Sequence, residues 1–171
     1  MVLEVSRGRV WKFGDNINTD LLMPTFTTAG KMDDSEVHKY CMVAVRPEFA
    51  QQSKPGDVVV AGSNFGCGSS RPAQRNLLRL GITCVICESM APIFYRNAIN
   101  LGLPVLIRPG VSDLLEDGDE VEVNPRTGEL VNIANGEEIQ LDPLPDVLMD
   151  ILEAGGLLGL LKRDVAEGKV V

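Results

Sequence analysis

A glycine-rich segment near the middle of the sequence carries the side chains best suited to chemistry. It spans Gly62–Gly68, with three glycines in seven residues, and runs directly into Ser69, Ser70 and Arg71. Two hydroxyls and a guanidinium therefore follow a tight turn. The guanidinium can grip a carboxylate through two parallel hydrogen bonds. This combination predicts a binding site for a small carboxylate or phosphate.

The elements around this segment are expected to be a buried strand and a helix. The strand is the apolar run 58–61, and Pro72 suits the first turn of a helix that we expect to end at Gly81. In an open α/β sheet, ligands bind where a strand's carboxyl end leads into the next helix, whose first turn offers free N–H groups to anions. The simpler interpretation is a glycine turn in which Ser70 caps the helix without binding a ligand.

The segment does not match two common phosphate-binding loops. A Walker A loop would end in Gly-Lys-Ser or Gly-Lys-Thr, which does not follow these glycines. The spacing of Gly62, Gly66 and Gly68 also differs from the dinucleotide-binding fingerprint. Nucleotide binding is therefore not the favoured chemistry.

The rest of the pattern predicts an α/β fold. A first strand is expected at 5–13, and beyond the glycine-rich segment come a buried strand at 82–87, a helix around 93–101 and a strand at 103–107. Together with 58–61 these form a βαβαβ centre with parallel strands. Alternating segments separated by turn residues then indicate antiparallel hairpins, and two helices follow; these elements are expected at 120–123, 130–133, 138–141, 146–154 and 157–167.

Length and composition set the broad class. The chain has 171 residues, of which 44% are hydrophobic, so we expect one domain over residues 1–171 with a substantial core. The net charge of −8 argues against a nucleic-acid partner. No apolar run approaches the roughly 20 residues that span a bilayer, and the N-terminus does not resemble a signal peptide. We therefore expect a cytoplasmic protein without a membrane or nucleic-acid partner.

The four cysteines give little sign of a metal or redox site. In a reducing cytoplasm Cys41, Cys67, Cys84 and Cys87 are expected to stay free. Cys84 and Cys87 have C-x-x-C spacing, but they lie in an apolar strand where their sulfurs should face opposite sides. Core packing is the favoured role, and we assign no metal ligand to this chain.

Three motifs carry a resemblance to a known family. They are the segments 13–20, 62–71 and 89–104, the first followed by Pro24. In this order they resemble the swivel domain of the aconitase family, and within it the small subunits of isopropylmalate isomerases. The similarity extends over nearly the whole chain.

The resemblance implies a swivelling β/β/α fold and a hydro-lyase that dehydrates and rehydrates a small 2-hydroxy dicarboxylate. It also implies a large catalytic subunit as partner, in a heterodimer or heterotetramer, which carries a [4Fe–4S] cluster that this chain does not bind. The leading hypothesis is a small subunit of the 3-isopropylmalate dehydratase type. Alternatives are a homoaconitase or dimethylmalate dehydratase small subunit, or a non-catalytic module that binds a carboxylate or a partner.

The resemblance also assigns roles to residues. Ser69 is implied to be the base that removes a proton alpha to a carboxylate, while Ser70 and Arg71 hold substrate carboxylate. Asp20 is expected near the same face, where it would orient Arg71; the simpler reading is a turn-capping carboxylate. Family members usually continue with Glu after the arginine, whereas this chain has Pro72. That departure is the one feature that favours the non-catalytic module.

Residues 25–34 are expected to form a flexible loop that sets substrate choice. In the resembling enzymes this loop touches the variable group of the substrate, and homoaconitase-type members place an arginine in it. Here it contains Phe26, Thr27, Thr28 and Lys31 but no arginine. An extra carboxylate would be left without a partner, which is costly, so the loop predicts a malate with a short alkyl group. Lys31 is expected to be solvated.

Overall fold

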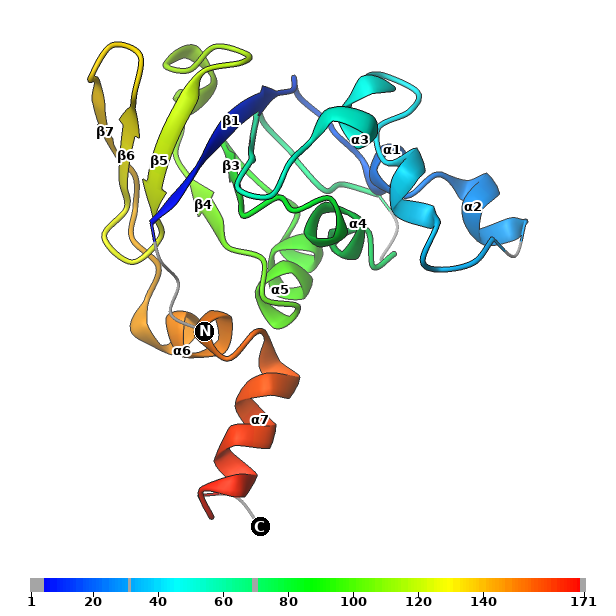
Figure 1. Ribbon diagram of the computed structural model, residues 1–171, viewed down its shortest axis with the longest axis vertical. Coiled ribbons are helices and arrows are strands. Elements are labelled where there is room, and N and C mark those ends of the chain that lie inside the picture. Colours follow the sequence, from blue (N-terminus) through cyan, green and yellow to red (C-terminus); the bar gives the residue numbers. More distant parts are fainter. Residues whose placement is uncertain (1–4, 31, 69–70, 170–171) are drawn as a thin grey trace.

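The computed structural model describes residues 5–30, 32–68 and 71–169. Seven strands form one mixed sheet in the order β4-β3-β2-β1-β5-β6-β7, with helices packed beside it (Figure 1). The strands are β1 (Ser6–Lys12), β2 (Val58–Ala61), β3 (Cys84–Cys87), β4 (Val105–Ile107), β5 (Glu120–Asn124), β6 (Glu129–Asn132) and β7 (Glu138–Gln140). The predicted α/β fold with a mixed sheet is confirmed.

The parallel half of the sheet contains the predicted βαβαβ unit. β2 pairs with β3 and β3 with β4, all parallel, and the connecting helices are α4 (Gln74–Arg79) and α5 (Pro92–Asn100). Every residue of β2 and β3 is buried, because both faces of this half are covered. That double burial explains why the two strands appear in the sequence as continuous apolar runs rather than as alternating patterns.

The antiparallel half is joined to the parallel half through β1. β1 pairs with β2 in parallel, with Val10 opposite Val58, and with β5 in antiparallel, with Ser6 opposite Val123. β5, β6 and β7 then continue as antiparallel hairpins. Exposed and buried residues alternate along β5 and β6, as the sequence predicted for strands with one solvated face.

Two hydrophobic cores lie on the two faces of the sheet. Val59 and Val85 face one core, into which Leu77 of α4 and Phe94 of α5 also pack. Val58 and Ile86 face the other core. This second core is closed by α6 (Asp146–Glu153) through Met149 and Leu152. Because neighbouring strand residues point to opposite faces, four-residue strands suffice to build both cores.

Short helices occupy much of the chain between β1 and β2, where the structure corrects the sequence prediction. The segment 25–34 was predicted to be a flexible loop, but it contains a helix that begins right after Pro24. The elements here are α1 (Thr19–Leu22), α2 (Thr25–Ala29), η1 (Val37–Tyr40) and α3 (Glu48–Gln52). A further 3-10 helix, η2 (Val111–Asp113), precedes β5. None of the described helices is long and apolar enough to cross a membrane.

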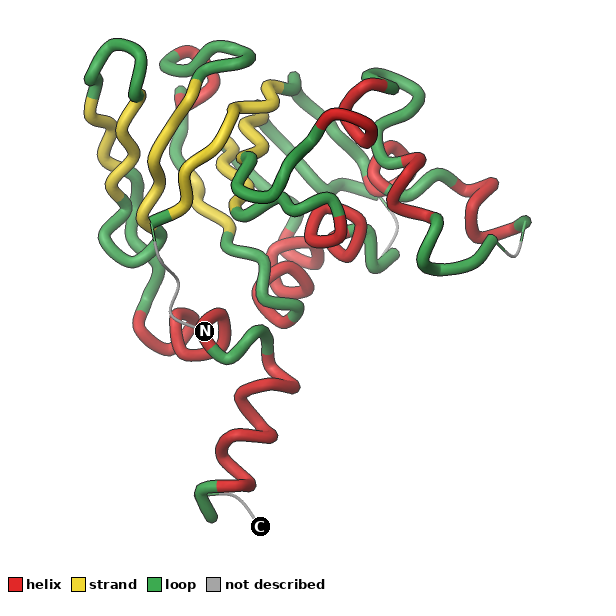
Figure 2. Tube along the Cα trace, viewed as in Figure 1, coloured by secondary structure: helices red, strands yellow, loops and turns green. Residues whose placement is uncertain are grey.

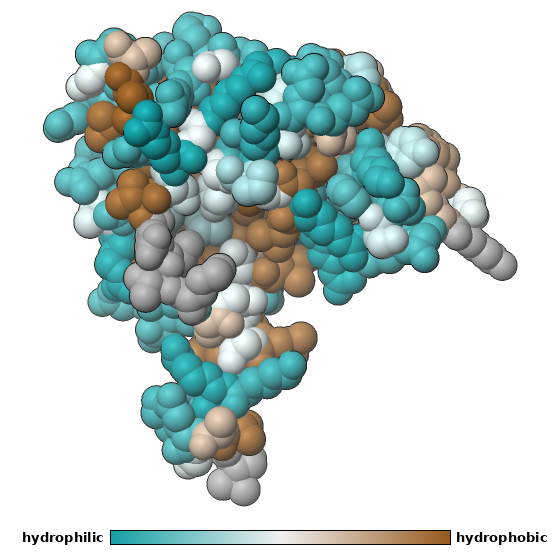
Figure 3. Space-filling model, in the orientation of Figure 1, coloured by the Kyte–Doolittle hydropathy of each residue, from teal (hydrophilic) through white to brown (hydrophobic). Residues whose placement is uncertain are grey.

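The last helix, α7 (Leu157–Ala166), points away from the body of the molecule (Figures 1 and 2). None of its residues is buried, and Leu158, Leu161 and Val165 are exposed. Figure 3 shows brown, apolar surface among the polar residues of this projecting helix. Its direction is set by Gly155 and Gly156, which both have positive φ angles, 76° and 106°. Residues other than glycine rarely adopt such positive φ angles.

A buried carboxylate joins the start of the sheet to the turn before β2. Asp57 is 5% exposed and accepts a hydrogen bond of 2.8 Å from the indole Nε1 of Trp11. It also accepts backbone N–H groups from Arg9, at 3.1 Å, and Lys54, at 2.9 Å. One side chain therefore satisfies three donors and sets the register of β1 against β2.

We predict that Asp57→Ala lowers the free energy of unfolding by about 3 kcal/mol or more, since each buried donor left unpaired costs roughly 1–3 kcal/mol. Asp57→Asn, which keeps one carbonyl oxygen, should cost less. Urea unfolding followed by Trp11 fluorescence provides the measurement. Asp142→Ala removes an exposed carboxylate and should change stability by less than about 0.5 kcal/mol. Equal stability of the Asp57→Ala and Asp142→Ala variants would contradict the role of Asp57 in pairing these three donors.

Candidate active site

The glycine-rich segment lies between two other segments, and backbone hydrogen bonds hold it on both sides. On one side, Gly66 N donates to Ile17 O at 2.7 Å, and Thr19 N donates to Cys67 O at 2.8 Å. On the other side, Phe65 N donates to Ser89 O at 3.0 Å, and Ala91 N donates to Phe65 O at 2.9 Å. The three sequence motifs, far apart along the chain, thus meet at one place beyond the carboxyl end of β2.

Polar side chains reinforce this arrangement. Asp15 accepts the backbone N–H of Ser63 at 2.7 Å, and a side chain at Gly62 would collide with that carboxylate. Asn16 and Asn64 both have positive φ angles, 57° and 60°, and their side-chain amides are joined by a 2.8 Å hydrogen bond. Asparagine is one of the few residues other than glycine that tolerates this conformation. The segment is therefore shaped by its side chains as well as by its glycines.

Arg71 lies beside this junction and points toward α1 and α2. Its Nη1 is 2.8 Å from the Asp20 carboxylate and donates at 3.1 Å both to Met23 O and to the hydroxyl of Thr25. Nε and Nη2 make no hydrogen bond to the described residues. One edge of the guanidinium is therefore oriented by the protein, while the Nε–Nη2 edge keeps the geometry that binds a carboxylate through two hydrogen bonds.

The local helices differ from the sequence prediction. α4 begins at Gln74 with Ala73 as its N-cap, so Pro72 precedes the first turn. Arg71 is therefore not part of the first helical turn. α1 is capped by Asn18, whose side chain accepts the N–H of Leu21 at 2.9 Å, so the Asp20 carboxylate does not serve as the cap. Ser69 and Ser70 themselves lie outside the described residues.

The residues expected to select the substrate fall into different environments. Phe26 is 53% exposed and contacts Tyr40 edge-to-face. Thr27 is buried and donates its hydroxyl to Pro24 O at 2.6 Å, whereas Thr28 is exposed on α2. Lys31 lies outside the described residues. Thr25, which accepts a hydrogen bond from Arg71, was not among the residues predicted from the sequence. Its position directly after Pro24 was the one sequence feature that could have indicated it.

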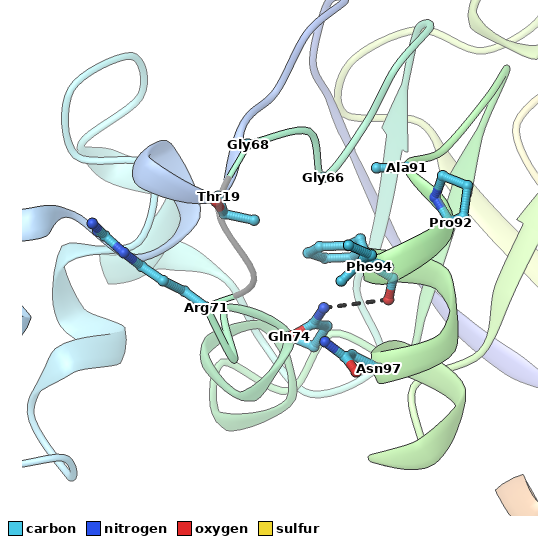
Figure 4. Close-up of a pocket in the computed structure, with 10 residues that line it drawn as sticks. Thr19, Gly66, Gly68, Arg71, Gln74, Ala91, Pro92, Phe94 and Asn97 are labelled. Atoms are coloured by element: carbon cyan, nitrogen blue, oxygen red, sulfur yellow. Dashed lines mark hydrogen bonds between the residues drawn. The ribbon is translucent and has the colours of Figure 1, made fainter.

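A small pocket of about 100 Å³ lies next to Arg71, between the glycine-rich segment and the starts of α4 and α5 (Figure 4). Gly66 and Phe94 line it, and Gln74 and Asn97 approach it from the two helices. Gln74 is 1% exposed and donates its amide Nε2 to Phe94 O at 3.3 Å. This pocket was not predicted from the sequence, because nothing in a helical glutamine marks it as a lining residue.

Comparison with known proteins identifies the family. Residues 15–109 match the model of the aconitase C-terminal domain. The chain is 52% identical to a 3-isopropylmalate dehydratase small subunit of Methanopyrus kandleri, covering 94% of this chain and 95% of that protein. The chain belongs to the aconitase C-terminal domain family.

Other members of this family support a full-length match. An isopropylmalate/citramalate isomerase small subunit of Methanocaldococcus jannaschii is 47% identical over 96% of this chain and 98% of that protein. A homoaconitase small subunit of Methanothermobacter thermautotrophicus is 44% identical over 96% and 95%. The crystal structure of a 3-isopropylmalate dehydratase from M. jannaschii superimposes with a TM-score of 0.88 at 39% identity, covering 97% of this chain and 99% of that one. The predicted swivel-type fold is thereby confirmed.

Cys41, Cys84 and Cys87 are buried as free thiols. Cys84 and Cys87 lie in different hydrophobic cores, as their spacing in a strand predicted. Burial raises the pKa of the Cys41 and Cys84 thiols well above the ordinary range and that of Cys87 to about 12, whereas cluster ligands are thiolates. No group of three or more His, Cys, Asp or Glu side chains among the described residues could hold a metal ion.

We predict that Gly66→Ala destabilises the junction because a side chain there would overlap the ring of Phe94. Gly136→Ala is a matched control: its φ of 73° nearly equals the 72° of Gly66, but nothing lies within 4 Å of the added carbon. Both variants should lose about 1–2 kcal/mol from backbone strain. Gly66→Ala should lose about 1–3 kcal/mol more from overpacking. Thermal or urea unfolding measures the difference. Equal losses of unfolding free energy in the two variants would contradict the predicted clash with Phe94.

Proposed function

We propose that this chain is the small subunit of a two-subunit hydro-lyase of the 3-isopropylmalate dehydratase type, acting on an alkyl-substituted malate. The observation that carries the proposal is the guanidinium of Arg71: Asp20 holds its Nη1, and its Nε–Nη2 edge, which has no partner among the described residues, is where a substrate carboxylate would bind. The full-length identity to small subunits that bear this name supports it. We expect the protein to work as one domain in the cytoplasm.

The proposed reaction divides the chemistry between two subunits. Ser69 would accept the proton alpha to a carboxylate, and Ser70 and Arg71 would hold that carboxylate during the proton transfer. Arg71 also favours the serine alkoxide by its positive charge. We place a [4Fe–4S] cluster in the large subunit, where it would act as a Lewis acid on the departing hydroxyl. Water then returns to the neighbouring carbon to give the isomer.

The related alternatives differ in the substituent on the malate. A homoaconitase small subunit is supported by the 44% identical relative of that name. Against it, the sequence of residues 25–34 lacks an arginine that would pair with an additional carboxylate. A dimethylmalate dehydratase small subunit agrees with that absence as well. A non-catalytic module was suggested by Pro72, but Arg71 has Asp20 as a carboxylate partner in place of the usual glutamate.

We predict that the purified chain alone is inactive toward 2- and 3-isopropylmalate, because the Lewis acid for the leaving hydroxyl is placed in the large subunit. Activity should appear after co-expression with a cluster-bearing large subunit, in a heterodimer or heterotetramer. The assay is the absorbance of the unsaturated intermediate. Clear turnover by the isolated chain would disprove the division of labour between the subunits.

Two substitutions separate the roles of Ser69 and Arg71 in the reconstituted enzyme. Ser69→Ala should lower kcat by about 10³-fold or more, as expected for removal of a primary catalytic group, with little change in subunit association. Arg71→Lys should mainly raise KM, because an ammonium cannot reproduce the two parallel hydrogen bonds. Steady-state kinetics with size-exclusion chromatography tests both. Near-normal turnover by Ser69→Ala would rule out its role as base.

A further inference from the structure

The last helix, α7, has an apolar face that the described part of the chain does not cover (Figure 1). Its exposed apolar residues follow the spacing i, i+1, i+4 and i+8, which places them on one side of a helix. They are Leu157, Leu158, Leu161 and Val165, and their exposed fractions range from 36% to 74%. The helix has ten residues, none of them buried. Helices this short have little stability in water without packing, so we expect a partner to cover this face.

A second apolar surface lies next to the start of this helix. It is a groove of about 720 Å³ on the body of the molecule, and none of the described residues that line it is charged. Its lining includes Val5, Leu78, Ile82, Leu101, Leu152 and Gly155, the last of which directly precedes the turn into α7. In Figure 3, brown surface lies on the body near the base of the projecting helix as well as on the helix itself. The chain thus presents both an apolar groove and an apolar helix face.

The base of α7 is fixed so that the helix does not fill the groove of its own chain. Gly156 lies so close to the end of α5 that an added side chain would meet the carbonyl of Asn100. A side chain at Gly159 would likewise meet the carbonyl of Ala154. These close contacts set the direction in which α7 leaves the body, and the described lining of the groove contains no residue of α7. The apolar face of α7 is therefore available to the groove of another molecule.

The groove and the candidate active site lie at opposite ends of the parallel strands. The groove is lined by residues that precede strands: Gly56 before β2, Thr83 before β3 and Pro104 before β4. The glycine-rich segment instead follows β2, and Ser89, which binds it, follows β3. A large subunit that brings its cluster to Arg71 approaches the carboxyl ends of the strands, so it is not the expected occupant of the groove.

We propose that the occupant is a second copy of this chain, with α7 of each copy lying in the groove of the other. A two-fold axis closes such an exchange, because both copies then use the same two surfaces. Since Gly155 borders the groove, the point where α7 leaves one copy lies beside the groove that receives α7 of the other. The active-site end of each copy stays free. The dimer does not depend on the function proposed above; where that function also holds, the complete enzyme is a heterotetramer.

Sedimentation velocity of the purified full chain tests the exchange. The wild type should sediment as a dimer. Leu158→Glu on α7 should raise the dimer dissociation constant by about 100-fold or more, because a central apolar contact is replaced by a charge twice in a two-fold dimer. Leu78→Glu in the groove should have the same effect. Val45→Glu is the control: Val45 is 54% exposed and lies outside both surfaces, so the dimer should be unchanged.

Mixing two variants separates this exchange from a direct pairing of two α7 helices. Leu158→Glu keeps an intact groove and Leu78→Glu keeps an intact α7, so an equimolar mixture should form a mixed dimer through one exchanged helix. The mixture should associate more strongly than either variant alone and less strongly than the wild type. Circular dichroism verifies folding. Should Leu78→Glu fail to fold, Val5→Glu takes its place, because Val5 lines the groove and is 52% exposed.

The outcomes identify the occupant. A monomeric wild type, or a dimer that Leu158→Glu leaves unchanged, would overturn the proposal. A dimer that is lost in Leu158→Glu but kept in both groove variants would assign the contact to α7 alone. Removal of residues 2–4, which precede Val5, should leave the dimer intact, and its loss would assign the interface to that segment. If Leu158→Glu prevented co-purification with the large subunit without changing self-association, the large subunit would be the partner of α7. An inactive two-subunit enzyme with a dimeric small subunit would refute the proposed function and leave the exchange standing.

Discussion

The candidate site depends on one constraint: the glycine-rich segment must run between two other segments with backbone hydrogen bonds to both. Gly66 binds Ile17 on one side, and Phe65 binds Ser89 and Ala91 on the other. Such close contact leaves no space for a side chain at Gly66, which would enter the ring of Phe94. The same backbone hydrogen bonds place Thr19 and α1 next to the glycine-rich segment and hold the start of α5 against it. Both the position of Arg71 and the shape of the small pocket next to it follow from this constraint.

The electrostatics of the site divide along Arg71. On one side of its guanidinium lie the Asp20 carboxylate, the Thr25 hydroxyl and a carbonyl oxygen, which together determine its orientation. The Nε–Nη2 edge makes no hydrogen bond to the described residues. A cation oriented by its own acceptors can present its remaining edge to a carboxylate through two parallel hydrogen bonds.

Much of the fold could be predicted from local patterns. The apolar runs of β2 and β3, the alternation in β5 and β6, and the glycines after α4 and α5 are each encoded by neighbouring residues, so they were recognisable without tertiary information. The short helices were not, because helices of four or five residues have little intrinsic stability and depend on packing. α2 is one such helix: Thr27 is buried against the rest of the protein, whereas the sequence around it resembles a loop.

For the site, the sequence by itself indicated the candidate residues and the family that they resemble, because Gly62–Gly68, Ser69, Ser70 and Arg71 form one contiguous motif. Only the tertiary structure decided which groups surround Arg71. Asp20, which the resemblance had placed near Arg71, and Thr25, which it had not, both come from a distant segment. These contacts depend on the path of the backbone through residues with positive φ angles and on its pairing with segments remote in sequence. Neither is encoded in the periodicity of neighbouring residues.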